Sequence, residues 1–233
     1  MKSKLLAYLL LVLFSSELSY SQKVGLSYGV FTGINLSTNY YTYEIPDENS
    51  DASFRNDPRT VFSIGGFISA SFTKNFEGRF QLQYADKGGV VEINVLPSQN
   101  VTSLTRTFTN TIQYLQFSLL PQLNLPIGES LDNSKVFAIA GGYFSTLLKA
   151  KENIESETSL QNQQLTTEKK VTDKLNSSDM GLIFGGGVVY KGFLIEVRYD
   201  LGLSDIVKDP DVEKVLSISN NSINFTVGYT GGF

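Results

Sequence analysis

Segments with alternating apolar and polar positions dominate the chain. In FEGRFQLQY, Phe76, Phe80, Leu82 and Tyr84 share one parity, and charged or amide side chains share the other. A period of two residues predicts a β-strand with one apolar and one polar face. The same alternation predicts seven further strands, near 24–36, 62–72, 112–120, 136–148, 180–190, 193–203 and 223–233.

The connections between these strands alternate in length. The turns at 73–75 and 191–192 are tight, and the one at 124–134 is moderate. The other connections are long and polar, at 37–59, 87–108, 149–179 and 204–221. An even strand number with short turns at one end predicts an all-β fold, an eight-stranded antiparallel up-and-down transmembrane β-barrel. We expect both termini on the short-turn, periplasmic side and the long loops outside the cell.

A soluble lipocalin-like barrel is the main alternative, because it also has eight antiparallel strands. The two faces distinguish the alternatives, since one carries large aliphatic and aromatic side chains and the other carries Gly, Ser, Gln and charges. An eight-stranded barrel has room inside only for a filling of side chains. The aromatic set would overfill that space, so we expect the apolar face to meet lipid and the polar face to line the lumen.

The polar face predicts a cluster in the lumen. Its members come from the strands at 76–84 and 193–203, and they are Glu77, Arg79, Gln81, Gln83, Glu196, Arg198 and Asp200. The five charged members sum to about minus one, so they can largely neutralise one another. We interpret them as a hydrogen-bonded ionic cluster that fills the lumen, with a translocation or ligand site as the less favoured alternative.

Composition narrows the chemistry further. The 233 residues include no Cys and no His, which removes the usual catalytic thiols, transition-metal ligands and acid/base groups that work near neutral pH. The formal net charge of -4 includes no basic excess that would hold nucleic acid. We therefore expect no enzymatic activity, no catalytic residues, no cofactor, no metal site and no nucleic-acid partner.

The N-terminus has the pattern of a cleaved secretory signal peptide. Lys2 and Lys4 precede an apolar run at 5–14, and Ser19-Tyr20-Ser21 resembles a cleavage site. The apolar run is too short for the ~20 residues of a membrane-spanning helix. We expect a signal peptide at 1–21 and a single barrel domain at 22–233.

Several segments together resemble the PorT-like family of outer-membrane β-barrel proteins of Bacteroidota. They follow one another in order along the chain: GVFTGINLS, YLQFSLLPQL, AIAGGYFSTLLKAK, DMGLIFGGGVVY, IEVRYDLGLSDI and NFTVGYTGGF. The resemblance implies a small outer-membrane barrel, and the namesake of the family is tied to protein secretion by the type IX system. It implies no catalytic or binding residues, because the shared motifs are folding motifs.

These observations favour a non-enzymatic integral outer-membrane protein with a structural or interaction role in the cell envelope. The alternative is an accessory factor in type IX-like protein secretion or in envelope assembly. A less favoured alternative is a carrier of a small molecule at the barrel mouth. The expected partners are outer-membrane lipid, the barrel assembly machinery and secretion or envelope proteins.

The last strand has a second predicted role. The ending SINFTVGYTGGF places Phe225, Tyr229 and Phe233 on one parity, and the chain stops at Phe233. An alternating aromatic ending resembles the signal that the insertion machinery recognises in outer-membrane barrels. We also expect this strand to pair with the strand at 24–36, which would remove the last open edge of the barrel.

Removal of Phe233 should impair membrane insertion more than it weakens strand pairing. The measurement is the amount of the truncated protein in isolated outer membranes. A normal membrane level would contradict the proposed assembly signal.

Overall fold

The computed structural model describes residues 25–43, 52–95, 104–127, 134–158, 164–208 and 215–232. The expected signal peptide at 1–21 and Phe233 lie outside these ranges. Within them, no helix is long and apolar enough to cross a membrane.

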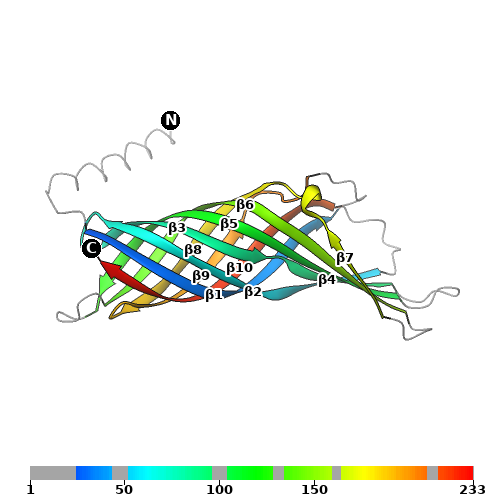
Figure 1. Ribbon diagram of the computed structural model, residues 1–233, viewed down its shortest axis with the longest axis horizontal. Coiled ribbons are helices and arrows are strands. Elements are labelled where there is room, and N and C mark those ends of the chain that lie inside the picture. Colours follow the sequence, from blue (N-terminus) through cyan, green and yellow to red (C-terminus); the bar gives the residue numbers. More distant parts are fainter. Residues whose placement is uncertain are drawn as a thin grey trace.

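Strands make up nearly all of the described chain (Figure 1). A single short 3₁₀ helix, η1 (Thr172–Lys174), interrupts them in the described residues. The strands are β1 (Gly25–Tyr43), β2 (Ala52–Ser71), β3 (Phe76–Lys87), β4 (Gly89–Val95), β5 (Leu104–Pro126), β6 (Lys135–Thr158), β7 (Gln164–Lys170), β8 (Ser178–Tyr190), β9 (Phe193–Gly202) and β10 (Val215–Gly232).

The strands close into a ring. β1 pairs with β2, and the antiparallel ladder continues through β3, β5, β6, β8 and β9 to β10. β10 then pairs with β1 from Ser27↔Gly232 to Tyr43↔Val215. β4 prolongs β3 beyond Gly88, and β7 adds to one end of β6. The eight-stranded antiparallel barrel is thus confirmed, as is the pairing of the last strand with the first.

The short turns lie at one end of the barrel. Lys191 and Gly192 have φ angles of 48° and 87° and join the paired residues Tyr190 and Phe193. Two successive positive φ values define a type I′ turn, whose twist matches that of the flanking strands. β1 begins and β10 ends at this same end of the barrel (Figure 1).

The two faces of the strands differ as the alternation predicts. On β9, Ile195 is 62% exposed and points away from the barrel, whereas Arg198, which has the opposite parity, is 1% exposed and points inward. Large apolar side chains are exposed around the ring, and the buried set is rich in Asn, Gln, Ser and charges. This is the reverse of a soluble barrel, so the prediction that the apolar face points outward is confirmed.

The four long connections were predicted to be loops, and this is wrong for much of their length. β1 and β2 continue through 37–43 and 52–59, and β4, β5, β6, β7 and β10 likewise extend into the segments assigned to loops. These extensions are rich in Ser, Thr, Asn, Lys and Glu and carry only scattered apolar residues, such as Val91 and Ile154, so the apolar alternation of the membrane-facing parts does not continue through them. Backbone hydrogen bonds between neighbouring strands stabilise these extensions, which do not need an apolar face toward lipid.

The extended wall separates into two parts beyond the end of the β1–β2 ladder. That ladder stops at Ser37↔Arg59, after which β2 pairs with β4 and β1 pairs with β10. Pro58 has no amide hydrogen to donate. The Asn56 side-chain amide donates instead to the backbone carbonyl of Asn39, near the point where the two strands separate.

Glycines allow the strands to approach closely on one side of the barrel. A Cβ at Gly141 would lie 2.1 Å from the carbonyl oxygen of Leu119 on β5. A Cβ at Gly185, in the glycine run of β8, would lie 2.6 Å from the carbonyl oxygen of Val197. A side chain at 185 would therefore force β8 and β9 apart.

Gly141→Ala should destabilise the barrel by about 1–3 kcal/mol, because backbone must move to admit the methyl group. Gly142→Ala is the matched control, since a Cβ there would make an ordinary contact at 3.7 Å with the carbonyl oxygen of Gly181. The measurement is the temperature at which each variant loses its fast-migrating form on a denaturing gel. Equal temperatures for both variants would contradict the close approach at Gly141.

Candidate functional site

The barrel interior holds the candidate site. The structure places all seven residues of the predicted lumen cluster inside the barrel, each 8% exposed or less. Glu77, Arg79, Gln81 and Gln83 project inward from β3, and the other three members project inward from β9. Alternation on each strand directs these side chains to the same side as the lumen.

An ion-pair network joins the two groups across the lumen. Arg79 Nη1 lies 2.5 Å from Glu196 Oε2, and the other carboxylate oxygen of Glu196 lies 3.6 Å from Arg198 Nη1. Arg198 Nε is in turn 3.3 Å from Asp200 Oδ1. Each carboxylate thereby lies next to at least one guanidinium, which a buried charge requires.

Amide side chains extend this network. Gln81 donates to Gln83 Oε1 at 2.9 Å, and the same oxygen accepts from the guanidinium of Arg198. Gln116 on β5 donates to Asp200 at 3.2 Å, and Ser145 on β6 donates to Gln116 Oε1 at 3.2 Å. The network therefore links β3, β5, β6 and β9 through side chains as well as through the sheet.

Glu77 lies at the short-turn end of the lumen and has different partners. Its carboxylate lies 2.6 Å from Lys135 Nζ on β6 and accepts from Gln122 at 3.3 Å. Glu77, Lys135 and Arg79 line one small pocket inside the barrel. The guanidinium of Arg79 lies 3.8 Å from the centre of the Phe67 ring. The aromatic face covers the cation on a side where no carboxylate pairs with it.

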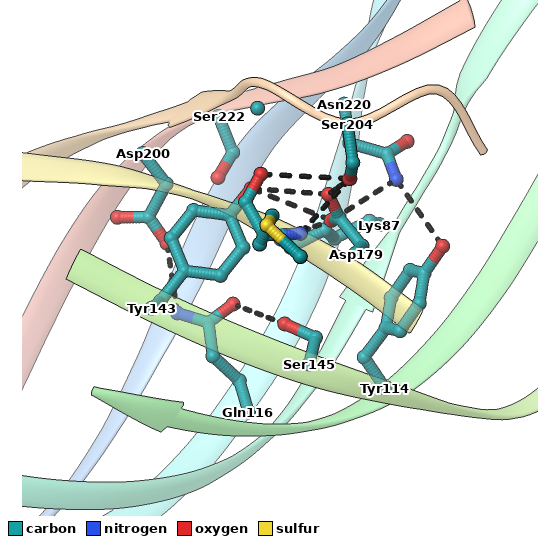
Figure 2. Close-up of polar contacts among 12 residues, drawn as sticks. Lys87, Tyr114, Gln116, Tyr143, Ser145, Asp179, Asp200, Ser204, Asn220 and Ser222 are labelled. Carbon is teal, nitrogen blue, oxygen red and sulfur yellow. Dashed lines mark hydrogen bonds and ion pairs between the residues drawn. The ribbon is translucent and has the colours of Figure 1, made fainter. Parts of the chain in front are cut away.

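A second charged cluster lies toward the other end, and the sequence analysis did not identify it. Lys87 Nζ lies 3.1 Å from Asp179 Oδ2. Figure 2 shows three more side chains converging on Asp179: Ser204 donates at 2.9 Å, and Tyr143 and Asn220 donate at 3.4 Å. Lys87 shares the parity of Glu77 and Arg79, so extending the alternation past Tyr84 was the signal available for it.

The buried charges compensate one another. The buried cations Arg79, Lys87 and Arg198, together with the half-buried Lys135, match the anions Glu77, Asp179, Glu196 and Asp200, so these eight formal charges sum to zero. The five charges of the predicted cluster sum to minus one, and the three additional charged residues provide the balance. A neutral set of paired charges is the form in which a low-dielectric interior tolerates them.

The interior is not polar throughout. An apolar cluster of Leu120, Phe137, Ile139, Tyr143, Ile183, Val189 and Leu194 occupies the wall formed by β5, β6, β8 and β9. A second apolar cluster lies farther from the short turns, where Ile206 packs with Tyr114, Ile112 and Ala150, and Val171 and Leu175 pack against them. Polar side chains therefore predominate in the interior, and these apolar clusters lie beside them.

The segment that carries Ile206 is fixed by backbone hydrogen bonds. Ile206 N donates to Ile218 O at 2.9 Å, and Asn176 N donates to Ile206 O at 2.8 Å. Leu175 and Val207 form an isolated antiparallel bridge. These contacts fill the gap in the barrel wall between β10 and β6. Within the described part of the chain, no group of three potential metal ligands occurs.

The closed ring and the exposed apolar face agree with the protein family that the sequence matches. Residues 17–208 match the family described as outer membrane protein beta-barrel domain. The chain belongs to this family. It is accordingly a protein of the bacterial outer membrane. No curated protein matches the sequence.

Similar folds occur among solved structures. Ail from Yersinia pestis, in complex with the heparin analogue sucrose octasulfate, has 13% identity over 90% of this chain and 100% of its own, with a TM-score of 0.38. The N-terminal β-barrel domain of Pseudomonas aeruginosa OprF has 14% identity over 86% and 97%, with a TM-score of 0.29. The outer membrane protease OmpT from Escherichia coli has 11% identity over 92% and 98%, with a TM-score of 0.33. At these scores, none of the three bears on function.

The residues of the expected assembly signal lie on the outer face where they are described. Phe225 and Tyr229 are exposed on β10, and the Tyr229 ring meets Phe193 edge-on with centroids 5.8 Å apart. Phe233 lies outside the described residues. Both described side chains are therefore directed toward lipid.

Arg198→Ala should lower the stability of the barrel by about 3–5 kcal/mol, because it leaves the buried Asp200 without its cation and Glu196 with only one of its two. Arg55→Ala is the control, since the Arg55–Asp57 pair is exposed to solvent and such pairs contribute about 0–1 kcal/mol. Urea unfolding in detergent micelles measures both. An unchanged unfolding midpoint for Arg198→Ala would rule out a stabilising role for the network.

Proposed function

We propose that this protein is a non-enzymatic integral outer-membrane barrel with a closed lumen and a structural or interaction role in the envelope. The observation that carries the proposal is the filled interior. Arg79 and Arg198 are the largest fully buried side chains among the described residues, and both lie in the middle of the ion-pair network. With these ion pairs and the two apolar clusters packed between the strands, the lumen offers no route for a sizeable solute.

The membrane placement follows from the exposed apolar band. On β1 this band extends from Leu26 to Leu36. That length corresponds to the roughly 9–11 residues that a tilted strand needs to cross a bilayer. We place the short turns and both chain ends in the periplasm, and the paired extensions of β4 to β7 outside the cell. Contacts with other envelope components would then use these extensions.

Two partners follow from this placement. Outer-membrane lipid would surround the apolar band, and the barrel assembly machinery would recognise the terminal strand through Phe225, Tyr229 and Phe233. The outward orientation of Phe225 and Tyr229 supports this assignment, because it leaves both side chains accessible until lipid covers them.

The second candidate function is an accessory role in type IX-like secretion or envelope assembly. The resemblance to PorT-like proteins of Bacteroidota supports it, and the paired extensions of β6 and β7 beyond the apolar band provide a surface for protein contacts. Comparison of the secreted proteome with and without the gene distinguishes this role from a structural one, since only a secretion factor should change cargo export. A small-molecule carrier is less favoured, because paired charges and apolar side chains already fill the interior.

Purified protein in planar lipid bilayers should show no stepwise conductance. An open outer-membrane channel added to the same bilayer provides the positive control. Insertion is checked separately by the heat-dependent shift in gel migration. Reproducible conductance steps from the heat-modifiable protein would overturn the closed lumen and favour a transport function.

A further inference from the structure

Three lysines gather on the outer face of the barrel wall just beyond the apolar band. Lys151 on β6 lies directly opposite Lys170 on β7 in the antiparallel register. Lys149 lies two residues before Lys151 on the same strand and therefore on the same face. The buried side chain of Ala150, between them, marks the opposite face as the inner one.

The positive charge of this group is only partly compensated. Lys151 forms an ion pair with Glu168 on β7. Within the described chain, Lys149 and Lys170 have no ion-pair partner, and the directly opposed Lys151 and Lys170 repel each other. Lys151 and, more weakly, Lys149 hold the pKa of the Glu168 carboxyl below its ordinary value, so one carboxylate experiences two of the ammonium groups.

The position along the barrel axis identifies the environment. Phe144 and Leu148, on the same strand, are 46% and 50% exposed and belong to the apolar band that faces lipid. Lys149 follows Leu148 directly. The three ammonium groups therefore lie where acyl chains end and headgroups begin, and long lysine side chains can keep their charge at that level.

We propose that Lys149, Lys151 and Lys170 form a binding site for the phosphate of a phosphorylated lipid headgroup. A phosphate between them would relieve the repulsion across the β6–β7 pair. The adjoining Leu148 and Phe144 would contact the acyl chains of the same lipid, which a soluble phosphate cannot use. The site rests on the membrane placement given above and is independent of whether the lumen conducts.

The test compares two double variants that remove the same charge. Lys149→Gln/Lys170→Gln removes the two lysines without an ion pair and leaves the Lys151–Glu168 pair intact. Lys74→Gln/Lys169→Gln is the control, because Lys74 lies in the short turn after β2 and Lys169 faces the opposite side of β7, across from Glu152. A heat-dependent gel shift of both variants verifies that they fold.

Native mass spectrometry measures retained lipid after purification from phosphatidylcholine micelles containing phosphatidic acid. Each basic residue at an anionic surface contributes about fivefold in affinity, so the test variant should bind phosphatidic acid about 30-fold more weakly. The control should match the parent protein, and high salt should weaken the binding of the parent.

Three results would overturn the proposal: equal losses in both double variants, no preference of the parent for phosphatidic acid over phosphatidylcholine, or full competition by inorganic phosphate at equal concentration. The last result would indicate a free-anion site. None of these results bears on conductance, and conductance steps would leave the lipid site standing while overturning the closed lumen.

Discussion

Lipid provides no hydrogen-bond partner, so every backbone amide and carbonyl at membrane depth must be paired within the sheet. The β1–β10 ladder meets this requirement by joining the first strand to the last. Closure with eight strands also limits the interior to a space that side chains fill. The apolar side chains must then point outward to lipid, and the interior must be built from whatever the opposite parity provides.

The interior satisfies this constraint with two kinds of material. Paired charges occupy the centre and the region around Asp179, and apolar side chains occupy the β6–β8 wall, where glycines draw the strands together. The glycine at 185 leaves room beside Arg198, because a Cβ there would lie 2.6 Å from the Cβ of Arg198. The same glycine thus allows the strands to pack closely and leaves space for the buried side chain of Arg198.

Strand number, strand faces and the seven interior residues followed from period-two alternation, because one face meets lipid and the other does not. The extensions could not be found in this way, since polar residues predominate in them and their few apolar residues do not alternate regularly. Asp179 was missed for a related reason: it lies at the start of β8, beside a segment with the composition of a loop. The pairing of Arg79 with Glu196 spans 117 residues and depends on barrel closure, which no local pattern contains.

The contacts of Asp179 have a consequence for the order of assembly. Its partners come from β3, β6, β10 and the connection after β9, so they span the chain from Lys87 to Asn220. An unfinished barrel that lacks its final strand cannot supply Asn220, and the carboxylate stays hydrated. The full set of contacts to Asp179 therefore exists only once the last strand has joined the ring.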